Sequence, residues 1–171
     1  MTTYPIDKSK IEFHSSGLSR SEKAVALFRE GYNCSQAVAG AFSELFGMDE
    51  SVILRLSASF GGGFGRMREV CGAFSGISII LGLFCGSSDG ANSEAKAENY
   101  RLVQEASELF KEANGGSIIC RELLGLSAPE GTHIPAQRTA EYYQKRPCVE
   151  IVSNASDILV ELLQKYSSSN T

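Results

Sequence analysis

The sequence predicts an all-α protein, a single-domain bundle of about six to eight helices with a central apolar helix around residues 70–85. Apolar residues recur every three or four positions along most of the chain, and no segment alternates in the way a half-buried strand does. The 171 residues are enough for one hydrophobic core. We therefore expect one helical domain at 19–166, a flexible N-terminal arm at 1–18 and a disordered tail at 167–171.

The first part of this domain contains three predicted helices, each opened by a residue that caps helices well. These residues are Ser19, Asn33 and Asp49. Glu22 and Gln36 follow the first two caps by three positions, which is the spacing of a capping box. Glycines mark the ends of the first two stretches. The predicted helices cover residues 19–31, 33–47 and 49–56.

The central segment contains the most apolar helix of the chain. Val70–Cys85 has no charged residue, yet it is only 16 residues long and three glycines interrupt it. A helix that spans a membrane needs about 20 predominantly apolar residues. We therefore predict a core helix surrounded by other helices, with no membrane insertion.

The second half of the chain continues the helical pattern after a turn at Asp89-Gly90. Residues 126–138 contain two prolines and little periodicity, so this segment is predicted to be a loop. One or two helical turns are expected at 140–145. The remaining predicted helices cover residues 92–113, 118–124 and 147–166.

The charge pattern excludes one class of function. The net charge is −4 and no dense Lys/Arg run occurs, so binding to nucleic acid is not expected. The first 20 residues lack the basic-then-apolar layout of a secretory signal, which predicts a cytoplasmic protein. Structural disulfides are rare in that compartment, where cysteines at special positions are more often catalytic, redox-sensing or metal-binding.

Four of the five cysteines fall where a helix is predicted to start. Cys34 follows a capping Asn, Cys120 lies three residues after a Ser, Cys148 follows a Pro, and Cys71 opens the central helix. The positive end of a helix favours a thiolate, so these positions suit thiol chemistry. We expect the fold to gather the four sulfurs. Cys85 ends an apolar run instead and is predicted to be structural.

The surroundings of Cys71 make it the strongest candidate for a thiol of low pKa. Arg66 and Arg68 precede it and would favour the thiolate if they face it, although the intervening glutamate opposes them. Gly72 and Gly76 leave one face of the helix without bulk, which allows close approach of another backbone or of a ligand.

A glycine-rich segment lies just before this helix and is formed by Gly61, Gly62, Gly63 and Gly65, with Arg66 next to it. It lacks the spacing of a dinucleotide-binding loop and the Lys-Ser/Thr pair of a P-loop. The favoured interpretation is a close-packed loop that positions the cysteine of the central helix. A nest of backbone amides that holds an anion is the alternative.

The order of these motifs resembles a known family. The chain contains Asn-Cys-Ser-Gln-Ala at 33–37, Gly-Gly-Gly-Phe-Gly-Arg-Met at 61–67, Cys-Gly-Ala-Phe-Ser-Gly at 71–76, Cys-Arg-Glu-Leu-Leu-Gly at 120–125 and a late cysteine at 148. This looks like the C_GCAxxG_C_C family, described as putative redox-active proteins, over roughly residues 20–165. The resemblance implies that Cys34, Cys71, Cys120 and Cys148 are the family's cysteines.

Three hypotheses for the four cysteines follow. In the first they carry out reversible thiol–disulfide exchange with an unidentified electron donor or acceptor, with Cys71 as a principal thiol. In the second Cys34, Cys71, Cys120 and Cys148 bind a metal ion or an iron–sulfur cluster, although no Cys-x-x-Cys pair is present. In the third the protein binds a small ligand or a partner and its cysteines are structural. A homodimer is compatible with each, and the first is preferred.

Overall fold

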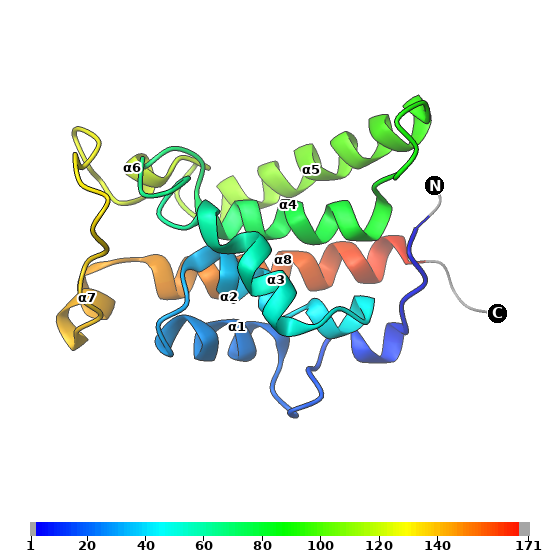
Figure 1. Cartoon of the computed structure of the whole chain (residues 1–171), viewed down its shortest axis with the longest axis horizontal. Coiled ribbons are helices and arrows are strands. Elements are labelled where there is room, and N and C mark those ends of the chain that lie inside the picture. Colours follow the sequence, from blue (N-terminus) through cyan, green and yellow to red (C-terminus); the bar gives the residue numbers. More distant parts are fainter. Residues whose placement is uncertain (1–2, 168–171) are drawn as a thin grey trace.

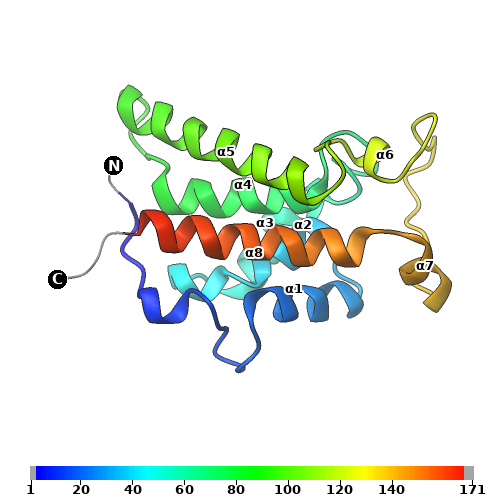
Figure 2. The same cartoon turned by 180° about the vertical axis from the view of Figure 1, so that it is seen from behind.

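The computed structural model describes residues 3–167 and confirms the all-α class, since this part of the chain forms helices and no strand. Short 3-10 helices lie at Lys8–Lys10, Ser43–Phe46 and Ala58–Phe60. Figures 1 and 2 show one bundle seen from its two sides. The α-helices are α1 (Arg20–Arg29), α2 (Cys34–Gly40), α3 (Glu50–Ser57), α4 (Gly72–Cys85), α5 (Ser93–Ala113), α6 (Cys120–Leu123), α7 (Ala140–Lys145) and α8 (Cys148–Tyr166).

The predicted central helix is confirmed as α4. Ten of its 14 residues are buried, and it contacts α2, α5 and α8. Figures 1 and 2 show α4 between α5 and α8. Gly76 permits the contact with α2, because a Cβ atom there would lie 2.8 Å from Cβ of Val38. The predicted close approach of another backbone at this glycine is therefore confirmed.

The predicted helix at 33–47 is wrong in its second half. The α-helix ends at Gly40, and the 3-10 helix Ser43–Phe46 follows it. The carbonyl of Ala41 accepts a hydrogen bond from Nη1 of Arg20 at 2.7 Å. Arg20 is completely buried, so its guanidinium needs hydrogen-bond acceptors within the protein. Its bond to the Ala41 carbonyl competes with the hydrogen bond that would continue the helix.

The N-terminal segment lies against the helical domain although it shows no helical periodicity. The side chain of Ile11 is completely buried and that of Ile6 nearly so. The amide of Tyr4 donates to the carbonyl of Phe84 at 2.6 Å. These contacts pack part of the predicted arm onto the core, while its flexibility stays a prediction. Of the predicted tail, residues 168–171 lie outside the described part of the chain.

One end of the bundle holds the starts of α2, α4, α6 and α8. In Figure 1 this is the left end, where α6, α7 and the loop between them also lie, whereas the first and last described residues lie at the opposite end. Helices from distant parts of the sequence therefore present their first residues to one region. Within residues 3–167, none of the helices combines the length and the apolar character needed to cross a membrane.

Candidate functional site

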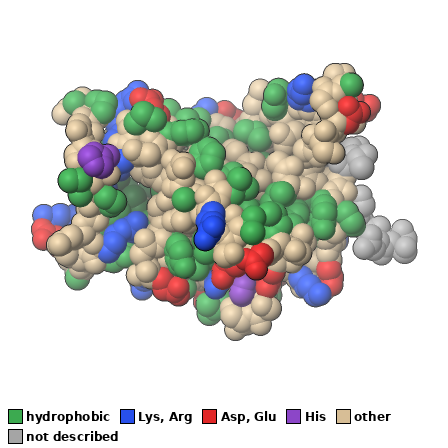
Figure 3. Space-filling model, viewed as in Figure 1, with side chains coloured by type: hydrophobic (Ala, Val, Ile, Leu, Met, Phe, Trp, Pro, Cys, Tyr) green, Lys and Arg blue, Asp and Glu red, His purple; other side chains and the backbone are tan. Residues whose placement is uncertain are grey.

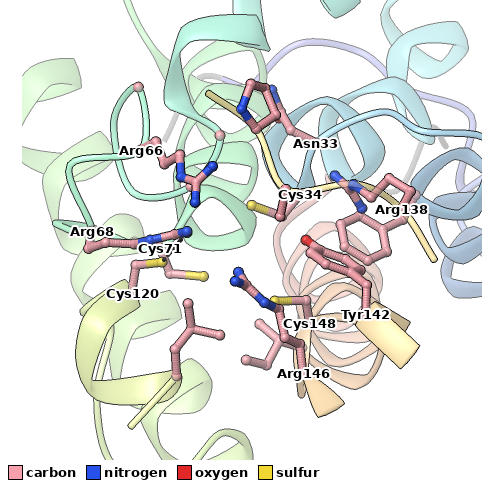
Figure 4. A pocket seen from close by; sticks show the side chains of 18 of the residues that line it. Asn33, Cys34, Arg66, Arg68, Cys71, Cys120, Arg138, Tyr142, Arg146 and Cys148 are labelled. Atoms are coloured by element: carbon pink, nitrogen blue, oxygen red, sulfur yellow. Dashed lines mark hydrogen bonds between the residues drawn. The ribbon is translucent and has the colours of Figure 1, made fainter. Parts of the chain in front are cut away.

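The four cysteines expected to come together line one cavity of about 280 Å³ at this end of the bundle. Figure 4 shows their sulfurs directed toward a shared space. All five cysteines of the chain are free thiols, so no disulfide holds this arrangement. The residues concerned are Cys34, Cys71, Cys120 and Cys148.

Cys34 is held at the first position of α2 by the predicted capping box. The side chain of Asn33 accepts from the amide of Gln36 at 3.0 Å, and Oε1 of Gln36 accepts from the amide of Asn33 at 3.0 Å. The Nδ2 group of Asn33 also donates to the carbonyl of Ala58 at 2.8 Å, which ties this cap to the segment after α3. The cap therefore places Cys34 against the glycine-rich loop.

Cys34 and Cys71 form a pair with unequal acidity. A hydrogen bond from the Cys71 thiol is the largest of the influences that lower the pKa of Cys34, which falls to about 6, and backbone amides of Gly62 and Ser35 act in the same direction. The pKa of Cys71 is raised well above its ordinary value by its interaction with Cys34 and by burial. The two sulfurs therefore titrate as a pair, in which the pKa of Cys34 is lowered and that of Cys71 is raised.

The prediction that Cys71 has the lowest pKa is wrong, because the arginines before it face elsewhere. Nη1 of Arg68 lies 3.9 Å from Sγ of Cys120, and the rest of its guanidinium is bound to Glu130. Arg66 also donates to Glu130, through Nη2 at 2.9 Å. The two cations are thereby directed to a carboxylate and to another sulfur.

Cys120 is joined to the start of α4 by backbone pairing. Its amide donates to the carbonyl of Glu69 at 2.6 Å, and the amide of Cys71 donates to the carbonyl of Ile118 at 2.8 Å. Burial raises the pKa of the Cys120 thiol, and Arg68 partly opposes that rise. This pairing brings together cysteines that are 49 positions apart in the sequence.

Cys148 lies at the first position of α8 and completes the group. Burial is the main reason that its pKa rises to about 12, and the charge of Cys34 adds to the effect. Cys85, by contrast, lies at the far end of α4, where its thiol donates to the carbonyl of Leu81 at 3.2 Å. Its distance from the cavity fits the structural role predicted for it.

The glycine-rich loop is a close-packed turn, as the favoured interpretation expects. Its backbone has positive φ at several positions, among them Gly62 (64°), Gly63 (72°) and Gly65 (54°). A Cβ atom at Gly63 would lie 2.7 Å from Cβ of Cys120, and one at Gly61 would lie 2.3 Å from Cγ of Asn33. The loop thus packs against the starts of α2 and α6, which carry Cys34 and Cys120, and does not merely precede α4 in the sequence.

Gly72 lets the Cys34 side chain approach the start of α4, where Cys71 lies. A Cβ atom there would lie 2.5 Å from Sγ of Cys34 and 2.9 Å from the carbonyl oxygen of Phe60. The absence of a side chain is therefore what allows the Cys34 sulfur to lie over the first turn of α4. The prediction of close approach at Gly72 is confirmed.

Several residues of the site have no signal in the sequence. Arg138 comes from the irregular loop after α6, Arg146 and Tyr142 from the region of α7, and Glu130 from the same loop as Arg138. The first three line the cavity with the cysteines. The ring centroid of Tyr142 lies 4.7 Å from the guanidinium carbon of Arg138 and 4.9 Å from that of Arg146. These residues can be identified as part of the site only from their position in the structure.

A metal site receives no support from the arrangement of side chains. Over residues 3–167, no three His, Cys, Asp or Glu side chains are grouped in a way that could hold a metal ion. His133 lines the cavity with the four cysteines but does not complete such a group. The four cysteines thus line one cavity, as expected, but they do not form the tight ligand cluster that the metal-binding hypothesis requires.

Comparison with known proteins agrees with the resemblance seen in the sequence. The family model "Putative redox-active protein (C_GCAxxG_C_C)" matches residues 32–162. No curated protein and no solved structure matches the chain. The matched range contains all four cysteines that line the cavity.

Proposed function

Since the chain belongs to the C_GCAxxG_C_C family of putative redox-active proteins, we propose that it is a thiol-dependent redox protein that exchanges electrons with a disulfide substrate. Cys34 is the attacking thiolate and Cys71 the resolving thiol. The observation that supports this proposal most is the pairing of the two sulfurs, which keeps one ionised while the other retains its proton.

The environment of Cys34 suits a nucleophile. A thiol with a pKa of about 6 is mostly ionised at neutral pH, and the optimal attacking thiol has a pKa close to the ambient pH. The side chain is only partly buried and lines the cavity, so a substrate that enters the cavity reaches it. Cys71 is more deeply buried and lines the same cavity.

The reaction has two steps. The Cys34 thiolate attacks one sulfur of the substrate disulfide, forms a mixed disulfide and expels the other sulfur as a thiolate. Cys71 then gives its proton to that leaving group, and its own thiolate attacks Sγ of Cys34, which releases the second half of the substrate. The substrate gains two electrons, and a Cys34–Cys71 disulfide results. An external dithiol restores the reduced pair by the reverse exchange.

Trapping of the mixed disulfide tests this assignment. Reduced protein prepared without oxygen is mixed with bis(2-hydroxyethyl) disulfide, a neutral substrate, and the products are identified by mass spectrometry of the intact protein and of its peptides. Wild type should form a Cys34–Cys71 disulfide and release two thiols. Cys71→Ser should stop at a mixed disulfide on Cys34, and Cys34→Ser should form neither product.

Cys85→Ser is the matched control, because Cys85 is a buried free thiol outside the cavity. It should behave as wild type does. Modification of Cys85, or equal reaction of the Cys34→Ser variant, would contradict the proposal. Stoichiometric iron and sulfide in the same preparation would instead favour the second hypothesis.

A further inference from the structure

The cavity has a charge opposite to that of the whole chain. The protein carries a net charge of −4. Among the described residues that line the cavity, however, four are arginines and none is a carboxylate. Figure 3 shows the surface hollowed at the corresponding end of the molecule, with Lys or Arg side chains beside the hollow. The four residues are Arg66, Arg68, Arg138 and Arg146.

Only part of this positive charge is balanced within the protein. Glu130 is not among the residues that line the cavity; it accepts hydrogen bonds from Arg66 and Arg68, while its second oxygen lies 3.7 Å from Nη2 of Arg146. The four guanidinium groups that line the cavity are thus matched by one carboxylate and by the thiolate proposed for Cys34. Two positive charges in the cavity lining remain unbalanced. Charges of one sign gathered in a cleft attract a ligand of the opposite sign.

Arg138 is held in place while part of its hydrogen-bonding capacity is left unused. Its guanidinium carbon lies 4.4 Å from the ring centroid of Phe28 and 4.7 Å from that of Tyr142, so two aromatic rings restrain it. Nη2 donates to the carbonyl of Tyr32 at 3.3 Å. Nη1 is buried and has no hydrogen-bond partner in the described chain.

Arg66, on the other side of the cavity, also has a donor that is left unused. Its Nη2 is bound to Glu130, whereas its Nε is buried and has no partner among the described residues. A buried donor without an acceptor costs free energy, and guanidinium groups are well shaped to bind oxyanions. Figure 4 shows Arg66 and Arg138 on either side of Cys34. Two unsatisfied donors thus flank the thiol that attacks.

We infer that the cavity selects a small disulfide with carboxylate substituents, and that Arg138 and Arg66 bind a carboxylate of that substrate while its sulfur meets Cys34. This inference rests on the proposed function and adds the substrate class to it. A carboxylate suits these arginines, because Glu130 is already held by Arg66 through a carboxylate oxygen. The volume of about 280 Å³ suits a small molecule rather than a protein loop.

Three disulfides of similar size test the inference. They are the disulfide of thioglycolate, which carries two carboxylates, the neutral bis(2-hydroxyethyl) disulfide, and cystamine, which carries two amines. The rate of reaction of each with the reduced protein is divided by its rate with free 2-mercaptoethanol, so that intrinsic reactivity cancels. We expect the normalised rate to be about tenfold higher for the dicarboxylate than for the neutral compound, as one charged hydrogen bond would provide, and lowest for cystamine.

Arg138→Gln should remove most of this preference, and 0.5 M NaCl should weaken it in the wild type. Arg55→Gln is the matched control, since Arg55 is an exposed arginine on α3, outside the cavity, and its loss should leave the preference unchanged. The salt measurement needs no variant, so the test holds even if Arg138→Gln fails to fold.

The outcomes separate the two proposals. If the neutral disulfide reacts at Cys34 and the dicarboxylate shows no preference, the substrate class is wrong while the redox function stands. If none of the three disulfides reacts at Cys34, the redox function itself is wrong. A preference for cystamine would also overturn the inference.

Discussion

Gly72 lies directly beneath Cys34, so that a Cβ atom on the glycine would be 2.5 Å from the cysteine sulfur. This contact joins the first turn of α4 to the first residue of α2. It explains why the cysteine at the start of α4 is followed by a residue without a side chain. It also places the Cys34 sulfur beside the start of α4, where Cys71 lies.

Replacement of Gly72 by alanine should therefore disturb both stability and chemistry. The methyl group would overlap the Cys34 sulfur and the carbonyl oxygen of Phe60, and overpacking of this kind costs about 1–3 kcal/mol of the free energy of unfolding. Chemical denaturation measures the loss. Gly82→Ala on the same helix is the control, since no atom lies within 4 Å of its added Cβ. It should stabilise the protein by up to about 1 kcal/mol.

The reactivity of Cys34 should follow its lowered pKa. Deprotonation produces the reactive form, so the rate of alkylation by iodoacetamide should rise with pH and reach half of its plateau near pH 6. At pH 5 the rate should be about tenfold below the plateau, because only about a tenth of the sulfur is then ionised. Peptide mapping after brief labelling identifies the site. A midpoint near pH 9 would contradict the assignment.

Cys71→Ala should shift this pH profile upward. The variant loses the thiol that contributes most to lowering the pKa of Cys34, so the pKa should rise and labelling at pH 7 should slow. The same titration with iodoacetamide gives the new midpoint. Cys85→Ala provides the comparison, because its thiol bonds to Leu81 and Asn99 away from the cavity. An unchanged midpoint in Cys71→Ala would show that the two sulfurs are not coupled.

Glu130 should stabilise the protein at neutral pH and lose this effect in acid. The neighbouring Arg68 and Arg66 lower its pKa from 4.5 to about 2. A carboxyl group whose pKa is lower in the folded state contributes stability above about pH 4.5, and this contribution disappears as the pH falls toward 2. We expect Glu130→Gln to lose about 1–2 kcal/mol at pH 7, after allowance for solvent screening.

The pH dependence distinguishes this ion pair from simple packing. The difference in unfolding free energy between wild type and Glu130→Gln should shrink when denaturation is repeated at pH 3. A difference that stays the same at both pH values would mean that the carboxylate charge is not responsible.

Local signals in the sequence were sufficient for most of the helices. The capping boxes at Ser19 and Asn33 form as expected, because each needs only residues three positions apart. The apolar run at 70–85 likewise predicts a buried helix without knowledge of its neighbours. The predicted helix at 33–47 is too long because Arg20, from another helix, takes the carbonyl of Ala41.

The candidate site, too, could be predicted from the sequence only in part. Four cysteines at predicted helix starts, and glycines beside them, are visible in the sequence. The order of the thiol pKa values is not visible there, since it depends on which groups face each sulfur. Arg68 is three positions from Cys71 in the sequence, yet its guanidinium lies against Cys120 and Glu130. The loop that carries Arg138 has no periodic pattern from which its place could be inferred.

The sequence by itself determined the helical class, the caps and the residues able to do thiol chemistry, because these depend on neighbours within about one helical turn. Only the tertiary structure decided that the pKa of Cys34 rather than that of Cys71 is lowered, and that arginines from distant segments line the cavity with them. The physical reason is that a pKa and a binding cavity depend on charge, hydrogen bonds and burial in three dimensions. These are set by packing between segments that lie far apart along the chain.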